Sequence, residues 1–259
     1  MAEIDRLAGE VHAALTAPHQ IPPLSETTPD FDSVAAYAVS RSVRALRAEP
    51  VVGRKIGFTN QTLWARYGVS GPMWGDMTPR TILRVSDAPV PLSPYCEPRL
   101  EPEVALKLRY VPDASSDDAA LIDAIEWFAP AFEVVHSIYP GWQFALTDCI
   151  AANSLHGALL LGPAEPPGDW SQNLAQLSLE LTRNGAHVET GRGENVMGGP
   201  LNALRYLLEG IAVSADKQLA AGDIITTGTL TDAWPLSPGE RWTAQYIGTP
   251  LQSITASFS

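Results

Sequence analysis

The chain has 259 residues, of which 45% are hydrophobic and 18% charged, and its formal net charge is -12 at pH 7. This composition is typical of a globular protein that can bury one substantial core. The acidic balance argues against a nucleic-acid partner, because phosphate binding needs a basic stripe and the sequence has none. A small anionic substrate remains compatible with it, since one cation reverses the field inside a cleft.

No apolar run reaches the roughly 18 residues that a transmembrane helix needs. The first residues, MAEIDRLAGE, include early acidic side chains and lack the apolar segment of a secretory signal. Cys96 and Cys149 form neither a disulfide framework nor a zinc pattern, as expected of two reduced thiols. We therefore expect a cytoplasmic protein that does not contact membranes.

The first 50 residues predict a small helical region. Residues 2–17 have apolar side chains at helical spacing, and a second helical stretch follows Asp30 and Asp32. Both aspartates suit a helix N-terminus, where negative charge is stabilised. A proline-rich connection, residues 19–29, separates the two helices.

From residue 51 onward, short apolar runs separated by Gly and Pro predict strands. The predicted strands are 51–58, 80–84, 103–110, 131–138, 155–162, 176–183, 223–229, 241–247 and 251–258. Two helices interrupt them, one over 118–128 and one that starts at Pro200, a natural first helical residue. Strands that arrive in runs favour an α+β fold over a doubly wound sheet.

The segment EPRLEPEVALKL, residues 97–108, contains two neighbouring acidic positions. In an extended strand, Glu101 and Glu103 share one face while Val104 and Leu106 lie on the other. Two adjacent carboxylates repel each other, so either one stays protonated or a cation lies between them. Oxygen ligands suit Mg²⁺, Mn²⁺ or Ca²⁺. A solvated strand edge also carries such pairs, and this pattern alone does not exclude it.

Glu133 and Lys55 lie in apolar, strand-like segments, where charged side chains are unusual. Glu133 is within AFEVVHSIY, and a buried carboxylate requires a partner. That partner is either a basic residue or a metal ion. Lys55 lies between Gly53 and Gly57, and a desolvated lysine near carboxylates can move protons or stabilise an enolate.

Other polar residues carry weaker signals. His136 and His156 lie in apolar runs and are interpreted as core histidines, and Ser154 lacks the context of a nucleophile. The glycine-rich segment 191–200 matches no nucleotide-binding spacing.

Taken together, the segments resemble the 2-hydroxypenta-2,4-dienoate (2-keto-4-pentenoate) hydratases and 4-oxalocrotonate decarboxylases. These form a branch of the fumarylacetoacetate hydrolase superfamily. The likeness extends from about residue 30 to the last residue. It is carried by GRKIGFTN, PMWG, LEPEVAL, FEVV, WQFALTDCIAAN and VMGGPLNAL, followed by LAAGDIITTGTLTDAWPLSPGE.

The resemblance implies an α+β protein with a mixed β-roll catalytic domain over residues 51–259. A smaller helical region, residues 1–50, would precede it. Homo-oligomers are common in this family, so a homo-oligomer is expected.

The resemblance also implies that Glu101, Glu103 and Glu133 hold Mg²⁺ or Mn²⁺, with Lys55 close to a small 2-oxo acid substrate. Asp148 is a further candidate for orienting water or substrate. These residues would support a hydro-lyase that adds water to a 2-hydroxydienoate or 2-oxo-enoate from the ring-cleavage catabolism of aromatic compounds.

Several positions depart from the family pattern. Asp76 stands alone after Gly75, where hydratases tend to carry an acidic pair, and His156 replaces a serine. Ala145 and Ala152 replace a lysine and an aspartate, and Ile138 an arginine, so a less polar or larger substrate is expected. Decarboxylation or C–C hydrolysis of a related 2-oxo acid is the alternative activity. A weakly active partner subunit of such an enzyme is the third hypothesis.

Overall fold

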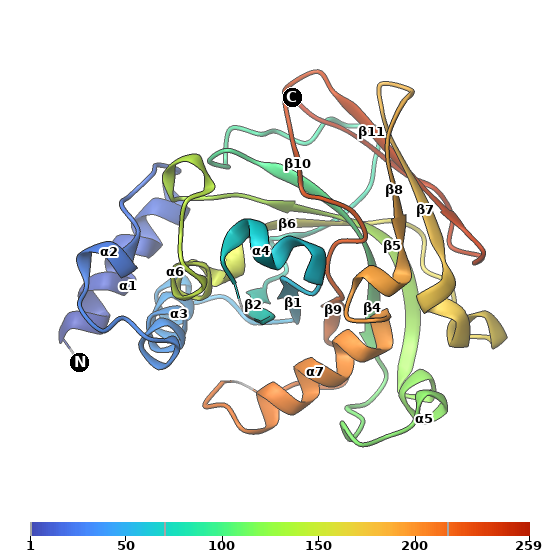
Figure 1. Ribbon diagram of the computed structural model, residues 1–259, viewed down its shortest axis with the longest axis horizontal. Coiled ribbons are helices and arrows are strands. Elements are labelled where there is room, and N and C mark those ends of the chain that lie inside the picture. The colour runs from blue at the N-terminus through green and yellow to red at the C-terminus, as the bar shows by residue number, and fades with distance from the viewer. Residues whose placement is uncertain (1, 70, 217) are drawn as a thin grey trace.

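The computed structural model describes residues 2–69, 71–216 and 218–259. Figure 1 shows the N-terminal helices gathered at one end of the molecule and the strands of two sheets filling the rest. None of the helices in the described ranges is long and apolar enough to cross a membrane.

The N-terminal region contains α1 (Ala2–Thr16), α2 (Leu24–Thr27) and α3 (Ser33–Arg47), which confirms the two predicted helices. Asp32 caps α3, because its side chain accepts a hydrogen bond from the Ala35 N–H. The apolar sides of α1 and α3 pack together and against α6 (Leu146–Ala151) in one hydrophobic cluster. That cluster also includes residues of the sheet region, and the domain boundary at residue 50 stays a prediction.

The larger sheet is mixed, and its strands run in the order β2-β1-β9-β4-β5-β6-β3, with β10 paired to β4. Its strands are β1 (Gly53–Gly57), β2 (Met73–Met77), β3 (Ile82–Arg84), β4 (Arg99–Leu108), β5 (Ile125–Val135), β6 (His156–Leu161), β9 (Ile224–Thr226) and β10 (Trp234–Pro235). The centre of the sheet, where β4 and β5 pair along almost their whole length, is buried on both faces.

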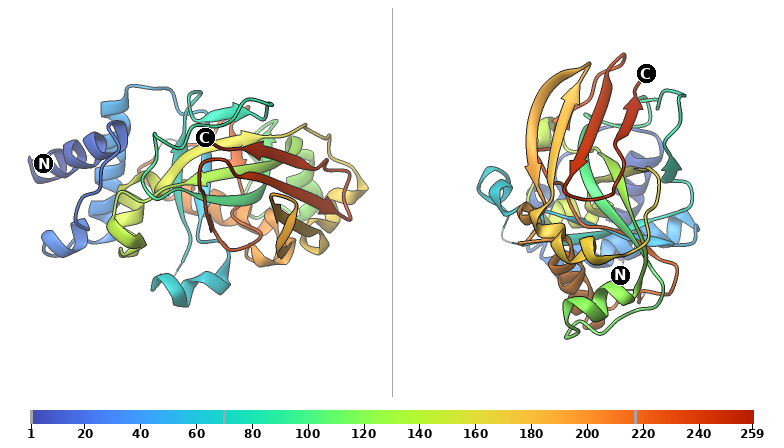
Figure 2. Two further views of the ribbon diagram at one scale, coloured as in Figure 1. Left: turned by 90° about the horizontal axis from the view of Figure 1, so that it is seen from above. Right: turned by 90° about the vertical axis from the view of Figure 1, so that its right-hand side faces the viewer.

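A second, antiparallel sheet has the order β12-β11-β7-β8. Its strands are β7 (Ser178–Arg183), β8 (Ala186–Arg192), β11 (Arg241–Ile247) and β12 (Ile254–Ser257). Figure 2 shows these strands side by side, next to the larger sheet. One hydrophobic core joins the two sheets and α7 (Pro200–Ala212). The mixed sheet with accompanying helices confirms the predicted α+β fold.

The predicted helix over 118–128 is wrong in its second half. Helix α5 covers only Asp118–Asp123, and the chain enters β5 at Ile125. Residues 125–128 carry aromatic and branched side chains and pair with β4, where Lys107 lies opposite Trp127. This long-range pairing outweighs the local helical spacing.

Some elements have no clear signal in the sequence. Strands β2, β8 and β10 and helices α4 (Trp64–Tyr67) and α6 are absent from the prediction, and β4 begins at Arg99 instead of residue 103. Their segments are short or polar, and β2 and β10 exist through partners distant in sequence, which a pattern read along the chain does not contain. Strand β8 differs, because it forms a hairpin with the preceding strand β7 across the turn at Asn184 and Gly185, a local signal that the prediction missed.

Candidate metal centre

Three glutamates on two paired strands form the centre of the candidate site. Glu101 lies directly opposite Glu133 in the β4–β5 pair, and Glu103 follows on the same face of β4. One carboxylate oxygen of each lies within 4.8 Å of those of the other two. Glu103 and Glu133 are buried and Glu101 is half-buried. Within the described part of the chain, the structure thus brings together the three residues that the sequence predicts as metal ligands.

Burial and neighbouring charges act differently on the three carboxyl groups. Burial raises the pKa of Glu101 to about 7. Burial, together with the charges of Glu133 and Glu101, raises the pKa of Glu103 well above its ordinary value. Burial acts in the same direction on Glu133, but the charge of Lys55 and a hydrogen bond from His156 lower that pKa to about 2. Without a cation, the cluster holds one firmly ionised carboxylate and two that retain protons easily.

Two side chains hold the Glu133 carboxylate. The Lys55 Nζ atom lies 3.4 Å from each of its two oxygens, and His156 Nδ1 lies 2.7 Å from Oε1. Burial acts to lower the pKa of Lys55, but the charges of the glutamates, led by Glu133, raise it above its ordinary value. Lys55 therefore stays protonated beside the cluster, as a cation in contact with one of the three carboxylates.

Glu103 is held mainly by backbone groups. Its Oε2 accepts a hydrogen bond of 2.7 Å from the Gly228 N–H, and the Tyr246 hydroxyl donates to its carbonyl oxygen. Gly228 has a φ of 102°, and a Cβ atom there would lie 1.6 Å from Thr59 Oγ1. Only glycine fits this position, so the approach of the loop to Glu103 depends on it.

A pocket opens beside Lys55 and Glu101. Its apolar walls are formed by Ile56, Phe58, Met73, Val135, Trp142, Leu155 and Ala233. Asn60 and Thr229 also line it, but their side chains bond to neighbouring loop residues. The lining is therefore mostly apolar, with polar groups of Lys55, Glu101 and Ser154 available to a ligand.

Ser154 is held in the pocket by a strained turn. Asn153, Ser154 and Leu155 have φ values of 54°, 55° and 62°, in the left-handed region that residues with side chains seldom adopt. The Ser154 hydroxyl is buried and has no hydrogen-bond partner among the residues that the structure describes. Strain of this kind is commonly found at functional sites.

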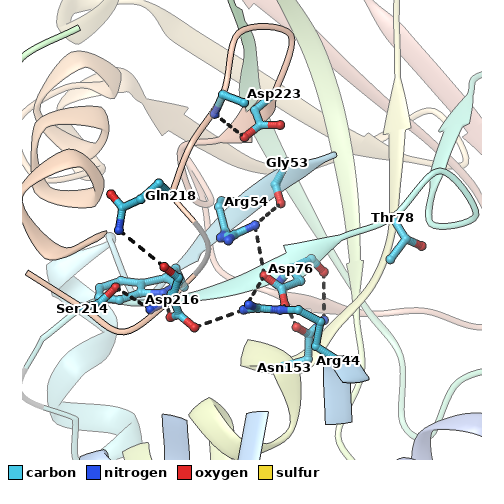
Figure 3. A network of polar contacts seen from close by, with 12 residues as sticks. Arg44, Gly53, Arg54, Asp76, Thr78, Asn153, Ser214, Asp216, Gln218 and Asp223 are labelled. Atoms are coloured by element: carbon cyan, nitrogen blue, oxygen red, sulfur yellow. Dashed lines mark hydrogen bonds and ion pairs between the residues drawn. The ribbon is translucent and has the colours of Figure 1, made fainter. Parts of the chain in front are cut away.

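A network of ion pairs supports this turn (Figure 3). Asn153 Oδ1 accepts a 2.7 Å hydrogen bond from the Asp76 N–H, and its Nδ2 donates to the Asp76 carbonyl at 3.0 Å. The Asp76 carboxylate in turn pairs with Arg44 of α3 and with Arg54 of β1. At Gly75, a Cβ atom would lie 2.3 Å from the Asn153 carbonyl oxygen, so the turn packs directly on β2.

The donor set fits a hard divalent cation. Three carboxylates offer only oxygen ligands, which Mg²⁺, Mn²⁺ and Ca²⁺ prefer. Glu103 Oε1 is buried and has no hydrogen-bond partner in the described ranges. A cation between the carboxylates would both satisfy this atom and offset the repulsion between Glu101 and Glu133 across the strands.

Asp148 lies apart from this cluster. It is buried in the first turn of α6, and its carboxylate accepts hydrogen bonds from the N–H and hydroxyl of Ser25 and from the Ala145 N–H. It is not among the residues that line the pocket. These contacts join α2 to the start of α6, so the structure gives Asp148 a structural position and no contact with the site.

Two residues at the site were missed as functional candidates. His156 is interpreted from the sequence as a core histidine, yet it donates to a predicted metal ligand across the β5–β6 pair. Its position at the start of a strand next to β5 was the only available signal. Ser154 has none, because nothing in the sequence predicts three consecutive left-handed residues.

The chain is similar to known proteins along most of its length. A 2-keto-4-pentenoate hydratase of Paraburkholderia phymatum is 32% identical over 99% of this chain and 97% of its own length. A 4-oxalocrotonate decarboxylase of a Pseudomonas species is 29% identical over 85% of this chain and 82% of its own.

Among solved structures, 4-oxalocrotonate decarboxylase from Pseudomonas putida G7, complexed with magnesium and adipate, superimposes with a TM-score of 0.90 at 26% identity. The match covers 100% of this chain and 98% of that one. The family profile described as fumarylacetoacetate (FAA) hydrolase C-terminal matches residues 73–254. These matches confirm the resemblance inferred from the sequence, and the chain belongs to the fumarylacetoacetate hydrolase family.

Proposed function

We propose that this chain is a metal-dependent hydro-lyase that adds water to a 2-hydroxydienoate or 2-oxo-enoate from the ring-cleavage catabolism of aromatic compounds. The observation that carries the proposal is the convergence of Glu101, Glu103 and Glu133, with Lys55 in contact with Glu133. Its hydratase relatives match along nearly the whole chain, and magnesium is bound in the related decarboxylase structure. Mg²⁺ or Mn²⁺ is the proposed cofactor.

The residues of the site have separate roles in binding the metal ion and the substrate and in transferring protons. Glu101, Glu103 and Glu133 would hold the cation, which would supply Lewis-acid chemistry toward a 2-oxo acid substrate. Lys55 is a protonated group at the edge of the pocket, placed to exchange a proton with the substrate and to stabilise developing negative charge. The Ser154 hydroxyl is free to donate a hydrogen bond to a substrate oxygen. The apolar walls accept the hydrocarbon tail and limit the access of water.

Decarboxylation of a related 2-oxo acid is the second candidate. Its support is the similarity to 4-oxalocrotonate decarboxylase along the whole chain, together with the apolar lining of the pocket. Asp76, the acidic residue in the position where hydratases tend to carry a pair, is bound by Arg44 and Arg54 instead of lining the pocket. With Asp76 outside the pocket, no acidic side chain at this position is available to activate water, which favours decarboxylation over hydration.

Product analysis separates these reactions. The chelator-treated protein is assayed with Mg²⁺ and a series of 2-hydroxydienoates by following the loss of dienol absorbance. Formation of a 4-hydroxy-2-oxo acid supports the hydratase, released CO₂ supports the decarboxylase, and two cleavage products support a C–C hydrolase. If no member of the series is converted while oxalate still binds with the metal, the hydro-lyase proposal fails in favour of a weakly active partner subunit.

The proposal includes a homo-oligomer in the cytoplasm. The family resemblance supports the assembly, and the two separate cysteines, typical of reduced thiols, support the compartment. Light scattering of the purified protein tests the first, and fractionation of the source cells tests the second.

A further inference from the structure

A second cavity adjoins the metal centre, with residues His156 and Gly157 at the start of β6 in its lining. It has a volume of ≈ 530 Å³, against ≈ 30 Å³ for the pocket beside Glu101. The last turn of α3, the turn after β2 and the segment after β5 also line it. Arg47, Thr78, His136 and His156 are among its polar side chains, and the ion pair of Glu49 with Arg80 also lies in the lining. The two cavities share none of their lining residues.

The guanidinium group of Arg47 lines this cavity and forms no ion pair with the described residues. It makes no hydrogen bond with them either. Asp76 and Glu49 are close enough to act on it through their charge, but Asp76 pairs with Arg44 and Glu49 with Arg80. Burial outweighs these charges and lowers the pKa of Arg47. A partly desolvated guanidinium in this situation favours a bound carboxylate or phosphate.

Two buried polar atoms of the lining have no hydrogen-bond partner within the described ranges: Thr78 Oγ1 and His156 Nε2. Thr78 is 3% exposed and His156 4% exposed. Figure 3 shows Thr78 apart from the Asp76 network, with no contact line reaching its side chain. Buried polar atoms normally have partners, so both atoms point to a ligand in the cavity.

The two histidines indicate which hydrogen-bond donors and acceptors such a ligand needs. His156 Nδ1 donates to the Glu133 carboxylate, so in the neutral imidazole Nε2 is an acceptor that needs an O–H or N–H group. His136 Nδ1 accepts from the Cys96 N–H, which leaves its Nε2 as a donor. His136, His156 and Arg47 line the same cavity, and burial, with smaller effects from the charges of the other two, lowers the pKa of His136 to about 4.

We propose that this cavity is a binding site for a small hydroxy acid, separate from the metal centre. The carboxylate of the ligand pairs with Arg47 and accepts from Thr78 and His136, and its hydroxyl donates to His156 Nε2. Because the same imidazole holds Glu133, the ligand would contact a residue that positions a metal-binding carboxylate. The proposal does not depend on which reaction the metal centre performs.

Calorimetric titration of the folded, chelator-treated protein tests this site. Lactate, propionate and inorganic phosphate are compared in wild type and in the variants Arg47→Gln and Thr78→Val. We expect lactate to bind one per chain and more tightly than propionate, which lacks the hydroxyl. Arg47→Gln should weaken lactate binding about tenfold or more, since it removes a charge-assisted contact. Thr78→Val, which changes little but the hydroxyl, should weaken lactate binding by a smaller factor. This variant tests the site even if Arg47→Gln fails to fold.

Two further variants locate the bound anion. Arg84→Gln makes the same substitution at an exposed position outside the cavity and should leave lactate affinity unchanged. Lys55→Met alters the pocket beside the glutamates, and because Lys55 and His156 share the Glu133 carboxylate, it should change lactate affinity less than Arg47→Gln does. The proposal is overturned by equal affinities for lactate and propionate, by binding of phosphate alone, or by the absence of saturable binding. Loss of binding in Lys55→Met but not in Arg47→Gln would place the anion in the metal pocket and overturn it as well.

Discussion

Glu133 differs from the other two glutamates because of its neighbours. Lys55 and His156 both contact its carboxylate, whereas Glu103 is held mainly by a backbone N–H and Glu101 is half-buried. Its pKa is therefore lowered while theirs are raised. We therefore expect Glu133 to be ionised before a cation binds, and metal binding to depend on it more than on Glu101 or Glu103.

Replacing Glu133 by Gln should abolish measurable metal binding. The amide keeps the size of the side chain but removes the charge that a hard cation needs. The loss of affinity should exceed the roughly 10–100-fold change typical of residues that only support a ligand. Calorimetric titration of the chelator-treated variant with Mn²⁺ measures it.

Glu126→Gln is the matched control for this experiment. Glu126 lies on the same strand, β5, but is exposed and pairs with Lys107. Its substitution should leave Mn²⁺ affinity unchanged. Equal affinities in wild type and Glu133→Gln would mean that the carboxylate cluster is structural.

Ser154→Ala should lower kcat/KM by about tenfold while the protein remains as stable as wild type. The hydroxyl has no partner among the described residues, so its removal breaks no protein contact. A hydrogen bond to substrate typically contributes about 0.5–1.5 kcal/mol, or more when the acceptor is charged. Steady-state kinetics and urea unfolding of the same preparation measure the two effects.

Ser137→Ala is the opposite case. The Ser137 hydroxyl is also buried, but it donates to the Tyr139 carbonyl at 2.7 Å and lies outside the pocket. That substitution should lower stability and leave kcat/KM unchanged. If the two variants behave alike in the assay, Ser154 does not contact the substrate.

At the scale of elements, the arginine–aspartate network connects the N-terminal helices to the site. Arg44 of α3 contacts both Asp76 on β2 and Asp216 beyond α7, and Trp74 donates to Asp216 at 2.7 Å (Figure 3). Asp76 then contacts Asn153, which begins the strained turn. Helix α3 is therefore connected to the strained turn of the pocket through a series of contacts between protein residues.

Asp76→Asn should destabilise the protein by about 3 kcal/mol or more, the usual consequence of removing one partner of a buried ion pair. The substitution leaves Arg54, whose side chain is 1% exposed, without its acidic partner in this network. The midpoint of urea unfolding should fall with an unchanged slope. Arg6→Gln, which breaks exposed pairs on α1, should change stability by less than about 1 kcal/mol. Equal effects of the two substitutions would contradict a supporting role for the network.

The sequence predicted those elements whose signal is local. Helix α7 begins at Pro200 and buries one apolar stripe, and α3 follows its capping Asp32, so both were predicted correctly. The segment 125–128 was not, because its conformation depends on pairing with β4. Three left-handed residues at 153–155 also depend on packing against β2, which no local pattern contains.

For the whole molecule, the sequence indicated the acidic ligands better than the groups around them. Glu101 and Glu103 were recognisable from strand period, and Glu133 from its unusual place in an apolar run. The family resemblance implied that the three glutamates share one site, and the β4–β5 register that brings them together comes from the structure. The contact of His156 with Glu133 depends on the β5–β6 pairing and on a register shift beside Val135. Neither feature can be predicted from a single sequence.

The contribution of Glu101 to the stability of the metal-free protein should fall as pH rises from about 4.5 to about 7. Burial raises the pKa of Glu101 to about 7 in the folded state. Below pH 4.5 both the folded and the unfolded chain hold this proton, so it does not affect stability. As pH rises, the unfolded chain releases it first, and the folded state is progressively penalised until Glu101 ionises near pH 7. The penalty reaches at most about 3 kcal/mol, since each pKa unit corresponds to about 1.36 kcal/mol.

A bound cation reverses this penalty by favouring the ionised carboxylates, so the stabilisation by Mg²⁺ should grow across the same range. Urea unfolding of the chelated protein, with and without Mg²⁺, between pH 5 and pH 8 measures both effects. Glu133 does not obscure the result, because its lowered pKa changes stability only at more acidic pH. Burial lowers the pKa of His136 to about 4, so this group adds stability as pH rises, but it does so in wild type and in Glu101→Gln alike. The difference in stability between the two metal-free proteins should therefore change with pH by the contribution of Glu101. An identical pH dependence in the two proteins would contradict this prediction. It would show that Glu101 is ionised near neutral pH even without a metal ion. The repulsion between the carboxylates would then be relieved by another cation, of which Lys55 is the nearest.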